Sequence, residues 1–234
     1  MKTIYVKKTL IAGKKILVKD RGEINHIKNV FRMKENDKLR VIDGEKEYIT
    51  IIKVIENKNM ELEVKEEIKT NNKSEVKIDI ALTMIKKDNM NLSIKKLTEI
   101  GIDKIIPLKT KRTVIKLDKK NPRWDKISIE ALKQCQGVTL VEITDPKNIN
   151  DLLLEEYDLV LVPYAKQKSF KLKEIKKEKY KKILYIIGPE GGFTEKEIEM
   201  LEKKGGILIT LGERILRAET AAIVVGGYLI NEFR

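Results

Sequence analysis

Short apolar runs rich in β-branched residues dominate the first part of the chain. The segments Lys38–Ile42, Glu47–Ile55 and Met60–Val64 have the composition of strands. The turn sequences Asp43-Gly44 and Asn57-Lys58-Asn59 separate them, and one helix-like segment, residues 24–33, precedes them. Short strands joined by tight turns within about 70 residues predict a small β-barrel.

From residue 76 onward, strand patterns alternate with helix patterns. Strands are predicted at residues 76–84, 104–108, 158–162, 183–187 and 207–211. Apolar positions at helical spacing, closed by Gly101, predict a helix over residues 88–100. A second helix is predicted over residues 123–136, with an apolar stripe formed by Trp124, Ile127, Ala131 and Cys135. Such alternation predicts an α/β domain with a mainly parallel sheet.

Two polar segments complete this organisation. Residues 69–74 contain no apolar side chain and are interpreted as a linker. The sequence therefore predicts two domains, residues 1–70 and residues 75–234. The lysine-rich segment 171–182 is interpreted as a solvated helix, with a binding patch as the alternative.

Composition limits the compartment and the chemistry. The 234 residues include no apolar run near the roughly 20 residues of a membrane span, and the N-terminus lacks the apolar core of a secretory signal. A lone cysteine, Cys135, cannot form an internal disulfide, which favours a reducing cytoplasm. With His26 as the single histidine, a His/Cys metal site is not expected, and His26 itself is predicted to have a structural role.

The net charge of +13 favours a polyanionic partner such as nucleic acid. The alternative is a genome-wide lysine bias, since 41 of the 49 basic residues are lysines. Charge alone leaves both explanations open.

Two glycine-interrupted loops carry most of the functional information. The first glycine loop, Gly188–Gly192, follows a predicted strand and precedes a helix whose start is marked by the capping-box pair Thr194 and Glu197. The second glycine loop, Leu211–Arg214, follows the next strand and leads into an alanine-rich helix from Ala218. Ligands of α/β sheets bind at the carboxyl ends of strands, so the two loops predict one pocket. The alternative is a pair of ordinary strand-to-helix turns.

Several well-known ligand motifs are absent from the sequence. Neither loop has the G-x-G-x-x-G spacing of a dinucleotide site or the G-x-x-x-x-G-K-[ST] spacing of a P-loop. No serine elbow with a histidine partner supports a hydrolase triad.

The residues of both loops resemble a known family. The segments IGPEGGFTEKEI and LGERILRAETA are similar to signature motifs of the RsmE family. The segment His26–Met33, the segment Lys96–Gly101, and Pro107 with Thr110 and Arg112 resemble motifs that this family carries upstream. The resemblance covers nearly the whole chain.

RsmE proteins are SPOUT-class enzymes that use S-adenosylmethionine to methylate uracil N3 in 16S rRNA of the small ribosomal subunit. The resemblance implies an α/β fold with a C-terminal trefoil-knotted parallel sheet and an N-terminal PUA-like β-barrel. It also implies a homodimer formed through the last helix. Together with the composition, it leads us to expect a cytoplasmic enzyme without a metal.

The resemblance further implies roles for individual residues. Arg217 is the candidate cation that steadies the uracil anion, and Glu219 is the candidate base or orienting group. An alternative for Arg217 is a helix-end ion pair with Glu213 or Glu219. The cofactor wall is predicted to comprise Leu161, Val162, Pro163, Ile187, Gly188, Pro189, Glu190, Gly191, Gly192, Leu211, Gly212, Ile215, Leu216 and Thr220. The predicted RNA contacts are Arg21, Lys28, Arg32, Lys96 and Arg112.

One segment departs from the family pattern. Residues 133–141 read KQCQGVTLV, where the family usually has an acidic residue first, then an arginine and a Val-Pro pair. Lys133 or Lys111 is the candidate substitute for the missing arginine. The departure leaves open two other functions: a silent RNA-binding scaffold, and a SPOUT enzyme with a different RNA target.

Overall fold

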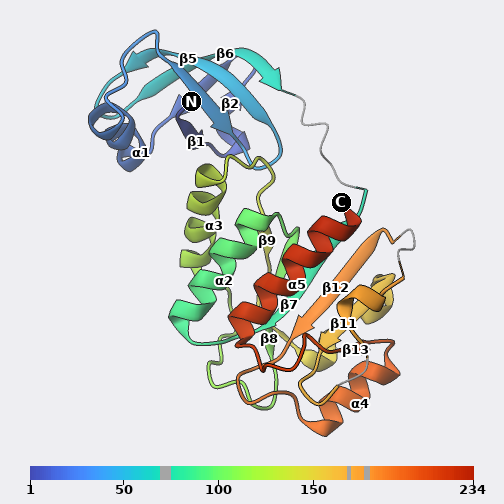
Figure 1. Cartoon of the computed structure of the whole chain (residues 1–234). Helices are drawn as coiled ribbons and strands as arrows, with labels where there is room; N and C mark the ends of the chain where they lie inside the picture. The colour runs from blue at the N-terminus through green and yellow to red at the C-terminus, as the bar shows by residue number, and fades with distance from the viewer. Residues whose placement is uncertain (69–74, 168–169, 177–179) are drawn as a thin grey trace. The chain divides into compact units, whose positions relative to one another are not determined.

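The computed structural model describes residues 1–68, 75–167, 170–176 and 180–234. The chain divides into two compact units, one of Met1–Lys73 with Leu132–Leu140 and one of Ser74–Ala131 with Val141–Arg234. The predicted linker, residues 69–74, lies outside the described residues. Figure 1 labels the elements of both units.

A six-stranded sheet forms the first unit, in the order β1-β4-β5-β6-β3-β2. β1 pairs with β4 in parallel and every other pair is antiparallel. The strands are β1 (Thr3–Tyr5), β2 (Ile11–Ala12), β3 (Lys15–Val18), β4 (Lys38–Ile42), β5 (Glu47–Ile55) and β6 (Met60–Ile68). The predicted limits of β4 and β5 are confirmed, and β6 extends four residues beyond the prediction.

Alternating side chains build the core of this unit. Tyr48, Thr50 and Ile52 of β5 are buried at every second position, as expected for a strand with one face inward. The helix α1 (Arg21–Asn25) is capped by Asp20, whose carboxylate accepts the Glu23 backbone N–H at 2.8 Å, and it continues as a π-helical turn, His26–Val30. Ile24 and Ile27 on its inner face are buried in the core.

The segment Leu132–Leu140 packs with the first unit through a buried cation. Arg40 of β4 is 7% exposed and contacts both oxygens of Glu47, at 2.7 and 2.9 Å. The Nη2 of Arg40 also donates to the carbonyl of Gln136 at 3.0 Å. Because a buried guanidinium needs acceptors for its N–H groups, these contacts hold the segment in place.

The second unit contains a parallel sheet, in the order β10-β8-β7-β12-β11-β13, with β9 beside β8. Its strands are β7 (Lys77–Thr83), β8 (Lys104–Lys109), β9 (Glu142–Ile143), β10 (Lys147–Asn148), β11 (Leu159–Pro163), β12 (Lys182–Ile187) and β13 (Ile207–Ile209). The predicted parallel α/β sheet is confirmed. Its strand order departs from chain order, since β12 lies between β7 and β11.

Helices cover both faces of this sheet. α2 (Lys87–Ile100) and α5 (Ala218–Phe233) lie side by side in Figure 1. Their apolar side chains share one core with Trp124 of α3 (Pro122–Gln134). α4 (Glu195–Lys203) contributes Ile198 and Leu201 to a second core. β12 alternates between the two, with Tyr185 in the first core and Leu184 and Ile186 in the second.

Four short 3-10 turns complete the secondary structure of the described residues. They are Lys8–Leu10, Ile149–Asp151, Leu154–Glu156 and Leu172–Glu174. None of the helices in the described part of the chain is both long and apolar enough to cross a membrane.

Two sequence expectations are wrong in detail. The segment 171–182 was predicted to be helical, but its described residues contain the 3-10 turn Leu172–Glu174 and, at Lys182, the start of β12, while residues 177–179 lie outside the described residues. Leu172 and Ile175 pack against the core, and such tertiary contacts outweigh helix propensity. Cys135 is exposed, because α3 ends at Gln134. Gln136 then takes a left-handed φ of 57°, and the Gly137 N–H donates to the Leu132 carbonyl at 3.1 Å.

Candidate active site

Loops at the carboxyl ends of the second unit's strands enclose a cavity of about 1500 Å³. Both glycine loops line it, together with the segments that follow β8 and β11. Cavities for one small molecule usually measure about 300–1000 Å³, so this cavity exceeds the needs of a single small ligand.

Basic side chains outnumber acidic ones around the cavity, eight to five. Some are already paired: Lys109 Nζ lies 3.1 Å from Asp118 Oδ1, and Lys166 Nζ lies 3.3 Å from Glu195 Oε1. The hydrogen bond to Glu195 raises the pKa of Lys166, so the shift favours the charged form that a lysine already has at neutral pH. The positive balance suits an anionic ligand.

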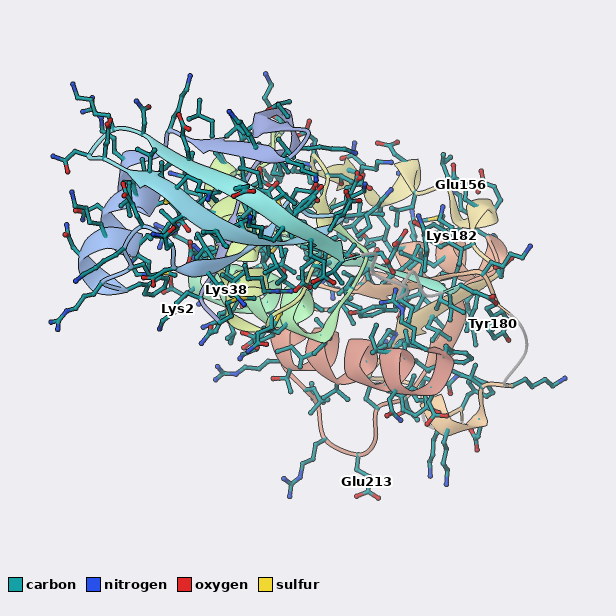
Figure 2. The ribbon with its side chains drawn as sticks, turned by 90° about the horizontal axis from the view of Figure 1, so that it is seen from above. Lys2, Lys38, Glu156, Tyr180, Lys182 and Glu213 are labelled. Carbon is teal, nitrogen blue, oxygen red and sulfur yellow. The ribbon has the colours of Figure 1, made fainter. Side chains whose placement is uncertain are left out.

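Arg217 lines the cavity and is the residue before α5. Its backbone is extended (φ −65°, ψ 155°) and its carbonyl accepts the Ala221 N–H at 2.8 Å. Its exposed guanidinium makes no hydrogen bond or ion pair with any residue in the described ranges, including Glu213 and Glu219. Glu213 points away from the second unit at the tip of its loop (Figure 2). The Arg217 cation is therefore available to a ligand.

Glu219 occupies a different environment from Arg217. It lies in the first turn of α5, is 7% exposed, and does not line the cavity. Its Oε2 has no hydrogen-bond partner among the described residues. The helix N-terminus stabilises a carboxylate at this position through the helix dipole.

The backbone of both glycine loops is open to the cavity. Gly192 (φ 69°) and Gly212 (φ 114°) have left-handed conformations, and a Cβ added at either would meet no atom within 4 Å. A ligand can therefore approach the peptide groups closely at both positions. This geometry fits S-adenosylmethionine, whose adenine suits apolar walls such as Ile187 and Leu216 and backbone hydrogen bonds.

A tight turn after β8 joins the first glycine loop to the cavity wall. In this turn, Thr110–Thr113, the Thr113 hydroxyl accepts the Thr110 N–H at 2.8 Å. Arg112 lies across the first glycine loop, and its Nη1 donates to the Gly191 carbonyl at 2.6 Å. The Lys111 N–H donates to Glu197 Oε1 at 2.8 Å. Two loops that are distant in sequence thus form one surface.

Most of the predicted cofactor residues lie together around the cavity. Those that line it are Pro163, Ile187, Gly188, Pro189, Glu190, Gly191, Gly192, Leu211, Gly212, Ile215 and Leu216. Leu161 and Val162 are fully buried in β11, so only Pro163 at the end of that strand reaches the cavity. Thr220 is exposed on α5 and is not part of the lining.

The predicted RNA contacts lie in both units. Arg112 lines the cavity, whereas Lys96 of α2 pairs with Glu99 at 2.7 Å and does not. Arg21, Lys28 and Arg32 are exposed on the first unit. Lys28 Nζ donates to Asn57 Oδ1 at 2.9 Å, and Arg32 has a left-handed φ of 54°.

The two candidate substitutes for the missing family arginine are placed differently. Lys133 Nζ lies 3.1 Å from Glu23 Oε1 in the first unit, and both side chains are at most one-fifth exposed. Lys111 lines the cavity with an exposed side chain. Of the two, Lys111 has the position expected of a replacement cation.

Sequence reasoning missed part of the cavity wall. Lys116, Tyr164 and the segment Phe193–Glu197 also line it. Glu197 was identified only as a capping residue, because a capping box is a local pattern. Its contact with Lys111 joins positions 86 residues apart and leaves no signal in a single sequence.

Comparisons with known proteins agree with this architecture. A family model described as the RNA methyltransferase domain matches residues 72–230, and one described as the RNA methyltransferase PUA domain matches residues 18–65. The ribosomal RNA small subunit methyltransferase E of Rickettsia conorii is 34% identical, over 94% of this chain and 91% of its own length. That of Bacillus subtilis is 34% identical over 86% and 84%.

A solved structure has the same fold. The ribosomal RNA small subunit methyltransferase E of Neisseria gonorrhoeae, bound to S-adenosyl methionine, superposes with a TM-score of 0.88 and 27% identity, covering 99% of this chain and 97% of that one. The predicted fold class, a SPOUT-type parallel sheet with a PUA-like N-terminal domain, is confirmed. The chain belongs to the ribosomal RNA small subunit methyltransferase E family.

Proposed function

We propose that this protein methylates N3 of a uridine in 16S rRNA, with S-adenosylmethionine as the methyl donor. The observation that carries the proposal is the basic cavity lined by the two glycine loops and by the unpaired Arg217. The name of the Neisseria relative and its bound S-adenosyl methionine support the choice of reaction and cofactor.

In the proposed cofactor site, accessible backbone groups and apolar side chains bind the ligand more than charged side chains do. Gly192 and Gly212 leave their peptide groups accessible, and Ile187, Leu211 and Leu216 provide apolar surface. When bound there, S-adenosylmethionine supplies an electrophilic methyl group. Glu190 also lines the cavity, and its carboxylate favours a positively charged ligand group.

Arg217 has the central role in the proposed mechanism. N3 of uracil must lose a proton before it attacks a methyl group, which places negative charge on the O2–N3–O4 system. A guanidinium fixed beside O2 or O4 stabilises that anion, and the cavity wall limits the approach of water. Glu219, a buried carboxylate in the first turn of α5, is the candidate base that takes this proton or the candidate group that orients Arg217.

The target base must leave its stack to reach such a cavity. Arg112 and Lys111 are the proposed RNA contacts on the cavity wall, because both are exposed beside the first glycine loop. Arg21, Lys28 and Arg32 are the proposed phosphate contacts of the PUA-like domain, and Lys96 is a further one. Phosphate contacts fix the register of the RNA, and the cavity selects the base.

The proposed assembly is a homodimer in the cytoplasm, formed through α5. Val224 of this helix is 45% exposed, and the neighbouring Gly227 leaves open space at its surface. Small and apolar groups of this kind allow close helix packing between subunits. Analytical ultracentrifugation tests the dimer, and a monomer at micromolar concentration would contradict it. Cell fractionation tests the compartment.

Nucleoside mass spectrometry of 16S rRNA from a strain lacking the gene tests the proposed reaction. We expect 3-methyluridine to disappear and to return when the wild-type gene is restored. Unchanged 3-methyluridine in the deletion strain would refute the proposed target. Loss of a different methylated nucleoside would instead identify a SPOUT enzyme with another substrate.

The variant Arg217→Ala tests the proposed role of the cation. We expect kcat to fall by about 10²–10³-fold, the usual effect of removing one donor from an anion-stabilising site. The Kd for S-adenosylmethionine, measured by calorimetry, should change less than about threefold. Retained turnover would remove Arg217 from the mechanism, and loss of cofactor binding would reassign it to the cofactor site.

A further inference from the structure

Glu197 is a buried carboxylate that connects two segments of the cavity wall. It is 8% exposed and lies in the first turn of α4. Its Oε2 accepts the Thr194 backbone N–H at 2.7 Å and the Thr194 hydroxyl at 2.9 Å. The Glu197 backbone N–H donates in return to the Thr194 hydroxyl oxygen at 3.3 Å, which completes the capping box of the helix.

The second carboxylate oxygen of Glu197 binds a different segment of the chain. Oε1 accepts the Lys111 backbone N–H at 2.8 Å, and Lys111 is the second residue of the turn after β8. A carboxylate that only capped a helix would leave this oxygen to solvent. Because both acceptors are used and the group is buried, the turn is fixed to the start of α4.

The turn itself is ordered internally. Thr113 is 5% exposed, and its hydroxyl accepts the Thr110 N–H at 2.8 Å and lies 2.9 Å from the Thr110 hydroxyl. Arg112, in the middle of the turn, is thereby directed across the first glycine loop. A Cβ added at Gly191 would lie 3.5 Å from the Arg112 Cδ, so the arginine stem packs on the glycine.

We propose that Glu197 is a positioning residue for RNA binding: it fixes the Thr110–Thr113 turn and so holds Arg112 on the cavity wall. The inference rests on the proposed function, since it takes RNA as the ligand of Arg112. Without Glu197 the turn loses its anchor to α4, and the Arg112 cation samples positions away from the RNA. RNA binding must then order the turn, and the lost conformational entropy weakens affinity without removing any RNA contact.

The test compares the RNA affinity of four single variants with that of the wild type. Glu197→Gln keeps the size of the side chain but replaces one acceptor by an N–H₂ donor, which cannot serve two backbone N–H groups. Thr113→Val loosens the turn without altering the helix cap, and so covers the case in which Glu197→Gln fails to fold. Arg112→Ala removes the cation itself. Glu199→Gln, on the exposed side of the same helix, is the matched control.

The ligand is unmethylated 16S rRNA in small subunits from the deletion strain, with binding measured in the absence of cofactor. We expect Arg112→Ala, Glu197→Gln and Thr113→Val each to raise the RNA Kd by about tenfold, as for a lost hydrogen bond to a charged group. Glu199→Gln should bind as the wild type does. The calorimetric Kd for S-adenosylmethionine should stay within about twofold in all four variants.

The double variant Glu197→Gln/Arg112→Ala separates positioning from general stability. If Glu197 acts through Arg112, the double variant loses less RNA affinity than the sum of the two single losses, and only the part that acts through Lys111 of the same turn remains. Additive losses, or a parallel loss of cofactor affinity, would overturn the inference, as would unchanged RNA affinity in Arg112→Ala. Methylation by the wild-type protein is measured separately, and its absence would refute the proposed function. If the wild type is active and Glu197→Gln binds RNA normally, only the role of Glu197 is refuted.

Discussion

Two adjacent glycines in α5 are predicted to respond in opposite directions to the same substitution. A Cβ on Gly226 would lie 2.6 Å from the Tyr185 hydroxyl oxygen and 2.9 Å from the Ile100 Cδ1. Tyr185 is fully buried and its hydroxyl donates to the Ala222 carbonyl at 3.1 Å, so the ring cannot move aside easily. A Cβ on Gly227 would meet nothing within 4 Å.

The magnitudes follow from two opposing contributions. Alanine stabilises a helix interior by about 1 kcal/mol relative to glycine, and an extra carbon in a packed core costs about 1–3 kcal/mol. Gly226→Ala should therefore lower the free energy of unfolding by about 0–2 kcal/mol, and Gly227→Ala should raise it by about 1 kcal/mol. The two variants should differ in unfolding midpoint by several degrees, at about 2–4 °C per kcal/mol for a domain of this size.

The assay is thermal unfolding followed by fluorescence of Trp124, the single tryptophan, which is buried in the core of the second unit. Tyr185→Phe removes the oxygen nearest to the added carbon, so it should reduce the penalty of Gly226→Ala in a double-mutant cycle. Equal midpoints for the two alanine variants would refute the packing argument. A Gly227→Ala midpoint that falls as the protein is diluted would instead identify Gly227 as part of a subunit interface.

Two further predictions concern pH. Asp79 is 2% exposed, accepts the Tyr157 hydroxyl at 2.9 Å, and has a pKa raised by burial. The folded state therefore favours the protonated carboxyl, so the stability that Asp79 contributes is fully present below the unfolded pKa near 3.9 and is lost as pH rises through the raised pKa. Asp79→Asn should therefore raise the Trp124 midpoint at pH 7 and lose this advantage near pH 4; no difference at pH 7 would contradict the assignment. The hydrogen bond from Arg40 lowers the pKa of Glu47, so that pair stabilises the first unit above about pH 4.3 and loses its effect as pH falls through the lowered pKa. Glu47→Gln should speed amide hydrogen exchange in β4 and β5 at pH 7, because the first unit should lose about 1.5–3 kcal/mol of stability. Equal exchange rates in the variant and the wild type would show that the ion pair does not stabilise this unit.

Much of the local structure was predictable from the sequence. The limits of β4 and β5 follow from β-branched residues between turn sequences, and these patterns act over a few residues. The end of α2 at Gly101 follows from glycine's access to a left-handed conformation, here with φ 88°. The capping box at Thr194 and Glu197 is a four-residue pattern and is present as predicted.

The resemblance to a family located the cavity but did not specify its wall. It named the glycine loops because their motifs are contiguous in the sequence, and both loops line the cavity. It extended the wall to Leu161 and Val162, which lie inside β11, since a motif cannot state which residues of a buried strand reach its end. It also could not distinguish Lys111 from Lys133, which the fold assigns to the cavity and to an ion pair with Glu23.

The sequence by itself determined most of the strands and helices, several of their ends, and which family the loops resemble. Those properties depend on backbone preferences and on the periodicity of neighbouring side chains. Only the tertiary structure decided that Glu197 anchors the turn carrying Arg112, that Gly226 leaves space for the Tyr185 hydroxyl, and that Arg40 donates to the Gln136 carbonyl. Each of these contacts joins positions far apart in the chain, and its energy exists only after the fold has brought the two surfaces together.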